Sequence, residues 1–429
     1  MSAHDDESST LQLEVSSDGG ASPSARPGSS LLAATCNLLN TVVGGGILAL
    51  PFAFKECGLA VGTAYQLIFG AASWYGSYLL LDSVRYRPTV ASYEALAQAS
   101  LGSKGALAYN IAALINCYGA CVSYLIAVGD VVPPLLAEMG HDMSRSAVLL
   151  LLAACVIFPL CALRDISALQ YASGLAIVIY IVFALTLGYL GFTAPAHTTP
   201  PLLVTADPAN WITAIPLCAF AFVHQTSLFP IYQEVADPSP RRMRAVVSTA
   251  VGLATLLYLL VSYAAYARFG QRIHGDILLN LAAVDSAGVR IVRLAFGLSL
   301  CLTYPCLHYA ARRALDQLLF SRRGATGRDS DGRDAPYVRL LALTCLLVGS
   351  SLGIALAVEQ VEVVFGFTGA VASTMLSYVL PAAIHLMLRP HRVTDMRANG
   401  TTAVFMLAGV AFGLVALINH TYKLARGVS

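Results

Sequence analysis

The amino-acid sequence predicts an all-α membrane protein with eleven transmembrane helices. Of its 429 residues, 57% are hydrophobic and only 12% are charged, whereas a typical soluble domain carries about 25% charged residues. The hydrophobic residues form blocks of roughly 20 residues, the length that spans a bilayer. Inside lipid the backbone must satisfy its own hydrogen bonds, so each block is expected to be a helix.

The first 30 residues have a different composition from the rest. They are rich in Ser and Gly, and their acidic residues are Asp5, Asp6, Glu7, Glu14 and Asp18. A segment with so few hydrophobic residues does not bury enough apolar surface to fold alone. We therefore expect residues 1–30 to be a disordered cytosolic tail.

Eleven apolar spans follow the tail. They are residues 31–54, 60–84, 106–128, 146–163, 168–192, 210–232, 245–269, 288–311, 337–357, 361–388 and 402–422. The first five spans (31–192) and the next five (210–388) form two groups, and the eleventh (402–422) stands apart. Most Lys and Arg residues fall in the loops on the side of the N-terminus, which is typical of cytosolic loops. The N-terminus is therefore expected to be cytosolic.

The first span is interrupted by three consecutive glycines, Gly44, Gly45 and Gly46. Each glycine weakens a helix by about 1 kcal/mol relative to alanine, and none has a side chain that would keep a ligand from the backbone. Close packing against another helix is the alternative explanation for small residues here.

The sixth span is also interrupted, with Pro216 and Pro230 near its ends and a polar stretch around His224 at its middle. The first and sixth spans each begin a group of five. Paired interrupted spans in corresponding positions indicate the binding site of a transporter. Unwinding frees N–H groups that attract an anion such as a carboxylate, and carbonyl groups that suit a cation such as Na⁺.

Several side chains near these interruptions are candidates for binding, each with an alternative. His224 could contact substrate or act as a protonatable gate, or it could be a neutral histidine bonded to a neighbouring helix. Asn40 could coordinate an ion or join two helices. Ser299 and Thr303 lie four residues apart on one helix face and could complete a cation site, although bonding back to their own helix is the commoner arrangement.

Other classes of function find no support in the sequence. The cysteines show no metal-ligand spacing, and no convergent catalytic set is visible, so no resident cofactor and no enzyme activity are expected. Nucleic acid is not an expected partner, because no basic run with interleaved aromatic residues occurs. No carboxylate lies near the middle of a span, which favours Na⁺ over H⁺. The Trp and Tyr residues are interpreted as interfacial anchors rather than substrate contacts.

Three stretches resemble the amino acid/auxin permease family, and most closely its branch of sodium-coupled neutral amino acid transporters. They are residues 37–58 (NLLNTVVGGGILALPFAFKECG), residues 219–243 (AFAFVHQTSLFPIYQEVADPSPRRM) and residues 302–305 (LTYP). The resemblance covers all eleven spans. It implies a LeuT-like fold, in which two inverted repeats of five helices carry interrupted helices 1 and 6.

The resemblance also implies the site residues. The substrate carboxylate is expected at the N–H groups of Gly44 and Gly45, and the cation at the Leu39 and Val42 carbonyls. The candidate substrate-binding residues are Thr41, Val43, Gly44, Gly45, Gly46, Phe220 and His224. The candidate cation ligands are Leu39, Asn40, Val42, Ser299 and Thr303.

The expected function is secondary active transport of neutral amino acids by alternating access, coupled to Na⁺ or H⁺. The chain departs from the branch in two ways: Val223 precedes His224 where the branch often has Cys, and the loop at 191–210 is short and lacks cysteine. These departures leave open the coupling ion and the membrane, which is the plasma membrane or that of a vacuole or lysosome. The alternative is an amino-acid sensor that signals through its N-terminal tail.

Overall fold

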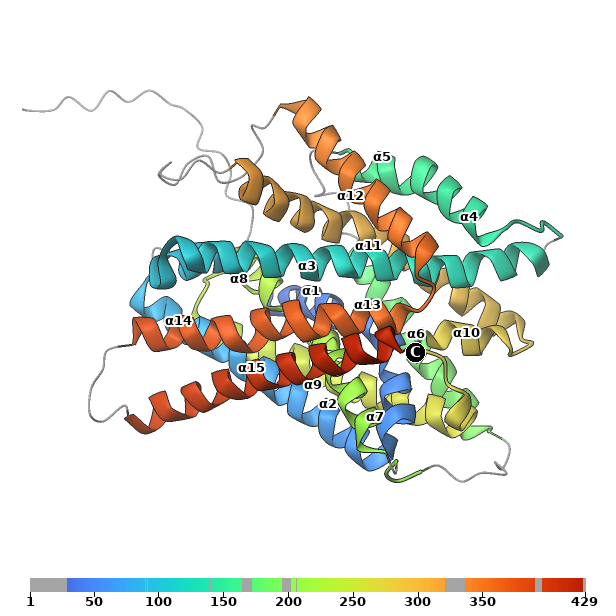
Figure 1. The fold of residues 1–429 in the computed structure, drawn as a ribbon, viewed down its shortest axis with the longest axis horizontal. Helices are drawn as coiled ribbons and strands as arrows, with labels where there is room; N and C mark the ends of the chain where they lie inside the picture. Colours follow the sequence, from blue (N-terminus) through green and yellow to red (C-terminus); the bar gives the residue numbers. More distant parts are fainter. Residues whose placement is uncertain are drawn as a thin grey trace, which may run out of the picture.

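The computed structural model describes residues 29–88, 90, 92–138, 140–163, 172–194, 202–205, 207–320, 336–389 and 396–426. Within these residues the regular secondary structure is helical, apart from one isolated bridge between Ser29 and Val235. The helices pack into a bundle in which many run alongside the long helix α3 (Tyr93–Glu138) (Figure 1). The predicted cytosolic tail lies outside the described residues, except for Ser29 and Ser30.

Eight helical stretches in the described part of the chain are long and apolar enough to cross a membrane. They are Tyr93–Glu138, Gly174–Phe192, Pro208–Glu234, Pro240–Arg272, Ala287–Phe320, Tyr337–Ala357, Val361–Leu388 and Asn399–Ala425. Two other predicted spans, Leu31–Val43 and Arg145–Cys161, are apolar but shorter. The last, α2 (Leu50–Ser83), has the length but buries polar residues such as Gln66 and Ser73, which lower its hydropathy. The prediction of eleven spans is therefore confirmed in part, for eight of them.

The first span is interrupted where the glycines predict it. Helix α1 (Leu31–Val43) ends at Gly44, whose φ of 33° lies in the left-handed region that favours glycine. A short 3-10 turn, η1 (Gly46–Leu48), leads into α2. The second half of the first predicted span continues into the second, with a sharp bend at Gly58 (φ 85°) between them.

The sixth span is interrupted as well. Three residues, 222–224, separate the end of α7 (Pro208–Ala221) from the start of α8 (Gln225–Glu234). The two interruptions touch, because a Cβ added to Gly46 would lie 2.7 Å from the Ala221 Cα. We call the two interruptions, residues 44–49 and 222–224, the paired breaks.

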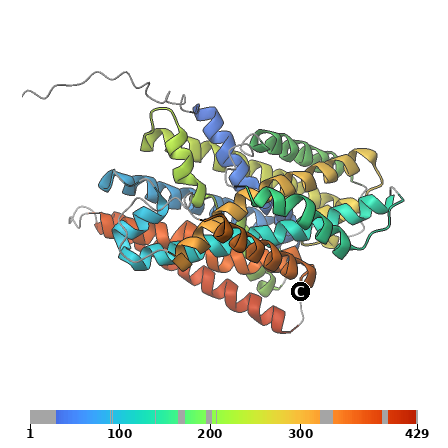
Figure 2. The same cartoon turned by 90° about the horizontal axis from the view of Figure 1, so that it is seen from above.

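Several helices pack around the half-helices that meet at the paired breaks. Helix α1 packs against α6 (Ala172–Phe192) and α9 (Pro240–Phe269), and α2 packs against α7 and α9. Helix α3 packs along α11 (Ala287–Phe320). Figure 2 shows the same bundle turned by 90°. The remaining elements are η2 (Val84–Tyr86), α4 (Arg145–Leu152), η3 (Ala153–Ile157), α5 (Phe158–Cys161), η5 (Gly270–Arg272), α10 (Ile277–Ala282) and α12 (Tyr337–Ala357).

The tenth predicted span contains two consecutive π-helical segments. It runs as α13 (Val361–Thr368), η6 (Gly369–Ser373), η7 (Met375–Val379) and α14 (Leu380–Leu388), and α15 (Met396–Ala425) packs beside it. Segment η6 packs tightly on α7, since a Cβ at Gly369 would lie 1.9 Å from the Pro216 carbonyl oxygen. π-Helical segments are often found at functional sites, and this one supports the half-helix that ends at the sixth-span break.

Candidate functional site

The N–H groups at the first break are held by two different partners. The Gly44 N–H donates to the Asn40 carbonyl oxygen (3.2 Å) and so completes the end of α1. The Gly45 N–H donates to the hydroxyl oxygen of Tyr124 on α3 (3.1 Å). Of the two N–H groups expected to bind a carboxylate, only that of Gly45 therefore points away from its own helix. The Tyr124 O–H can add a second donor beside it.

The carbonyl groups of both breaks converge on one hydroxyl. Tyr258 on α9 is fully buried. Its hydroxyl lies 2.7 Å from the Val42 oxygen, 3.2 Å from the Val43 oxygen and 2.8 Å from the Ala221 oxygen. One O–H has a single hydrogen, so it cannot fully satisfy three acceptors at once. The point where they converge is electronegative and includes Val42, one of the predicted cation ligands.

Two polar atoms near the first break have no hydrogen-bond partner among the described residues. They are the Asn40 Oδ1 and the Tyr180 hydroxyl, both buried. Tyr180, on α6, is close enough to Tyr124 and Tyr258 to interact with both electrostatically. Buried polar groups are normally hydrogen-bonded, so unpaired ones call for an explanation such as a ligand or ordered water.

These tyrosines correct the interpretation of the aromatic residues as interfacial anchors. Tyr124, Tyr180 and Tyr258 are buried at the paired breaks and come from three different helices. The sequence contained one signal for them. Tyr124 and Tyr258 lie well inside uncharged apolar spans, and a buried tyrosine usually needs a partner for its hydroxyl.

Ser299 and Thr303 both bond back to their own helix. The Ser299 hydroxyl donates to the Phe296 carbonyl (2.7 Å), and the Thr303 hydroxyl donates to the Ser299 carbonyl (2.8 Å). Both residues line a small cavity of about 20 Å³ between α6 and α11. This is the size of the space one water molecule needs. Their hydroxyl oxygens retain lone pairs, so the back-bonding is compatible with ion coordination.

His224 lies in a buried network that points toward α2. Its Nε2 is 2.8 Å from the Ser77 hydroxyl, and its Nδ1 is 3.0 Å from the Phe222 carbonyl oxygen. Gln225 extends the network: its amide donates to the Ser73 hydroxyl (2.9 Å), and its carbonyl oxygen accepts from Ser377 on η7 (2.8 Å). The structure thus matches the alternative of a histidine bonded to a neighbouring helix, and the network joins α8, α2 and η7.

This network leads to a prediction about stability. Replacing His224 with leucine removes the closest partner of the buried Ser77 hydroxyl, which keeps only a long contact with the Gln225 amide (3.4 Å). Such a loss costs about 1–3 kcal/mol. We expect His224→Leu to lower the melting temperature of the purified protein while the KM for substrate stays within about twofold. The exposed His141 provides the control, as His141→Leu should change neither quantity. A large rise in KM without loss of stability would instead make His224 a substrate contact.

Three further predicted substrate residues make contacts within the protein, and one of them contributes to the first break. Phe220 is buried, and its ring packs on Phe365 of α13 with centroids 4.4 Å apart. The Thr41 hydroxyl bonds back to the Asn37 carbonyl (3.0 Å). Val43 is fully buried and contributes its carbonyl group to the convergence at Tyr258.

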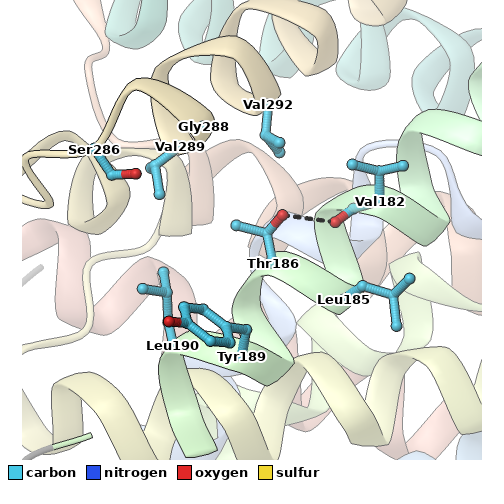
Figure 3. Close-up of a pocket in the computed structure, with 9 residues that line it drawn as sticks. All are labelled: Val182, Leu185, Thr186, Tyr189, Leu190, Ser286, Gly288, Val289 and Val292. Atoms are coloured by element: carbon cyan, nitrogen blue, oxygen red, sulfur yellow. Dashed lines mark hydrogen bonds between the residues drawn. The ribbon is translucent and has the colours of Figure 1, made fainter. Parts of the chain in front are cut away.

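A larger cavity lies away from the paired breaks. It measures about 450 Å³ and opens between α6 and α11 near Tyr189 (Figure 3). Its lining is mostly Val and Leu, and the Thr186 hydroxyl there bonds back to the Val182 carbonyl. Leu185 and Tyr189 are more than half exposed. The cavity is an apolar hollow on the outside of the bundle and offers no charge to an amino acid.

Comparison with known proteins identifies the chain's relatives. The family described as transmembrane amino acid transporter protein matches residues 27–425. Vacuolar amino acid transporter 5 of Schizosaccharomyces pombe is 29% identical, over 84% of this chain and 84% of that protein. Putative sodium-coupled neutral amino acid transporter 10 of Xenopus laevis is 26% identical over 90% of this chain. The chain covers only 36% of the length of that second relative.

The fold is shared with a solved structure, MhsT in complex with L-phenylalanine. The TM-score is 0.58 at 12% sequence identity, and the match covers 92% of this chain and 100% of the other. At so low an identity the likeness concerns the fold alone.

Proposed function

Because the chain belongs to the family of transmembrane amino acid transporter proteins, we propose that it moves neutral amino acids across a membrane by alternating access, coupled to Na⁺ or H⁺. One observation carries the proposal. Main-chain groups of two interrupted helices meet inside the bundle, and tyrosine hydroxyls are their partners. Such groups recognise the carboxylate and ammonium that all amino acids have in common.

In this proposal the substrate binds to main-chain groups that tyrosine hydroxyls contact in this structure. The carboxylate binds to the Gly45 N–H and the Tyr124 O–H, since both are donors and lie together. The ammonium group or a coupling cation is attracted to the carbonyls of Val42, Val43 and Ala221. Buried donors and acceptors that are already positioned bind a zwitterion without paying for a new arrangement of the backbone.

The coupling cation has a second candidate position. We propose a cation site formed by the Asn40 side chain, the Leu39 carbonyl and the hydroxyls of Ser299 and Thr303. The Asn40 Oδ1, which has no hydrogen-bond partner among the described residues, supports the Asn40 part of this site. A hard cation such as Na⁺ prefers oxygen ligands of this kind. Replacement of Na⁺ by choline tests this part of the proposal directly.

The position of the breaks supports a division of the chain into two repeats. We propose eleven spans, in which residues 31–192 and 210–388 form two inverted repeats and 402–422 forms the eleventh span. The breaks occur in the first span of each repeat, which supports this division. The half-helices α1 and α8 are joined by the bridge between Ser29 and Val235, so we expect them to move together.

Transport itself is tested with purified protein in proteoliposomes. We expect uptake of radiolabelled glutamine, alanine or leucine several-fold above protein-free vesicles under a Na⁺ gradient or a pH gradient. Protein-free vesicles and excess unlabelled substrate are the controls. Failure of both gradients to drive uptake of any of these amino acids would overturn the proposal.

For the location of the protein we propose the plasma membrane or the membrane of a vacuole or lysosome. Relatives include vacuolar transporters, which supports a vacuolar or lysosomal membrane for this multi-pass protein. The alternative function of a sensor depends on residues 1–30, most of which lie outside the described residues. The relatives are named as transporters, so the sensor is not favoured.

A further inference from the structure

Five charged side chains lie together at one end of the bundle, away from the paired breaks. We call them the charge cluster; its members are Asp130 on α3, Arg145 on α4, Asp276 before α10, Arg293 on α11 and Glu362 on α13. Figure 1 shows α4 and α10 on either side of this end of α3. Asp276 interacts electrostatically with Asp130, Glu362 and Arg293.

Asp130, Asp276 and Arg293 are buried, Arg145 and Glu362 are partly buried, and the five side chains are only partly paired. Asp276 is 2% exposed and Arg293 is 1% exposed. One oxygen of Asp276 accepts from the Leu278 N–H (2.8 Å). Among the described residues, the other oxygen has no hydrogen-bond partner, and neither do the Arg293 Nε and Nη2. Asp130 lies 3.5 Å from Arg145, beyond a good hydrogen bond, and its second oxygen is also unpaired.

Unpaired buried charges are costly, and a bound proton lowers the cost. With every group ionised, the three carboxylates outnumber the two guanidinium groups by one. One proton on a carboxyl group removes this excess. A protonated carboxyl group is also easier to bury than a carboxylate, because the cost of desolvation falls on the charged form.

The surrounding charges do not supply the missing partner. The Glu362 carboxylate packs on the Gly275 backbone, because a Cβ at Gly275 would overlap it. Glu138 pairs with Arg290 (3.2 Å), and Lys423 pairs with Glu56 (3.5 Å). The other charged or titratable groups at this end are Lys55 on α2, Glu359 before α13, and Arg272 and His274 before Asp276.

We propose that the charge cluster is a proton-binding site, with Asp276 as the group that takes the proton and Asp130 and Arg293 as the residues that set its affinity. The proposal rests on the proposed transport function and names H⁺ as a ligand of the transport cycle. When the proton leaves, Asp276, Asp130 and Glu362 repel one another and weaken the contact of the α10 segment with α3 and α13. Proton loss therefore favours opening of this end of the bundle.

The titration of Asp276 agrees in direction with this geometry. Burial, with the negative charges of Asp130 and Glu362, raises the pKa of Asp276 well above its ordinary value, against the lowering effects of the Leu278 N–H and Arg293. An acid whose pKa is raised on folding contributes stability that is present below its ordinary pKa, about 3.9 for Asp. That stability is lost as the pH rises through the raised value. The melting temperature is therefore expected to fall with rising pH, and less so in Asp276→Asn.

The test combines spectroscopy with transport. Infrared difference spectra of the purified full chain between about pH 5 and pH 8 should show a protonated carboxyl band that Asp276→Asn abolishes. Asp285→Asn is the matched control, because Asp285 lies just after α10, its side chain is 95% exposed and it pairs with Arg290. Its spectrum should match the wild type. In Asp130→Asn, which keeps Asp276 and removes a neighbouring negative charge, the band should titrate at lower pH.

Transport assays then distinguish a failure of the proton site from a failure of the proposed transport function. Exchange of labelled amino acid at one fixed pH, without a gradient, tests transport alone. We expect the pH dependence of net uptake to become at least about threefold flatter in Asp276→Asn while exchange continues. Unchanged pH dependence in Asp276→Asn, or a wild-type protein without the carboxyl band, would overturn the proton site. Absence of exchange in the wild type would contradict the proposed function, and the infrared result would still decide the proton site.

Discussion

Alanine at position 45 should reduce amino acid uptake by about tenfold or more. A Cβ at Gly45 would lie 2.5 Å from a ring carbon of Tyr124, a distance that real Cβ atoms essentially never show. The tyrosine would have to leave the Gly45 N–H, and overpacking of this kind costs about 1–3 kcal/mol. Because 1.4 kcal/mol is a factor of about ten in affinity, we expect substrate binding to weaken by about tenfold or more.

The matched control is Gly252→Ala on α9. A Cβ at Gly252 would meet nothing within 4 Å, so this variant should transport like the wild type. Binding of radiolabelled substrate to the detergent-purified variants separates a loss of the site from a loss of folded protein. Full substrate affinity in Gly45→Ala would contradict the role of the first break.

Phenylalanine at position 258 should have a comparably large effect, for a different reason. Tyr258→Phe keeps the aromatic ring, which packs edge-on against Phe222 with centroids 5.2 Å apart. It removes the one hydroxyl shared by the carbonyls of Val42, Val43 and Ala221. A buried acceptor left unpaired costs about 1–3 kcal/mol. The ends of α1 and α7 also lose the hydroxyl that contacts both of them.

We expect Tyr258→Phe to lower maximal uptake by about tenfold and to reduce the melting temperature in detergent. Tyr263→Phe on the same helix is the control. Within the described part of the chain that hydroxyl hydrogen-bonds to Thr63 (2.6 Å), and Tyr263 is 42% exposed at the outside of the bundle. Wild-type transport by Tyr258→Phe would mean that the convergence of the three carbonyls has no part in the cycle.

Composition was enough to predict the helical membrane class, and glycine and proline were enough to predict the breaks. Three adjacent glycines in an apolar span are hard to accommodate in a continuous helix, and α1 does end at Gly44. The transition from the first span to the second was less predictable. The chain bends at Gly58 without leaving the helical state, and hydropathy carries no signal for such a bend.

The partners of the main-chain groups could not be predicted, because they come from distant parts of the chain. Tyr124 reaches Gly45 from 79 residues away, and Tyr258 reaches Val42 from 216 residues away. The direction of His224 was equally hidden. Its depth in the membrane suggested a functional group, but its contacts depend on the rotation of α8 relative to α2, which only packing determines.

The charge cluster shows the same limit at the end of the bundle. Each of its residues lies near the end of a helix, where a charged side chain is expected to face water. The fold instead buries Asp276 and Arg293 between α3, α10 and α11. These carboxylates lie at the end of the bundle, whereas the lack of carboxylates that favours Na⁺ concerns the middle of the spans.

The most direct test of the account is a cryo-electron microscopy structure of the protein in a lipid nanodisc with glutamine bound. We expect ligand density between η1 and the gap from α7 to α8, with the carboxylate within hydrogen-bond distance of the Gly45 N–H. Glutamine bound outside the paired breaks, or a continuous helix through residues 44–46 in the bound protein, would contradict it.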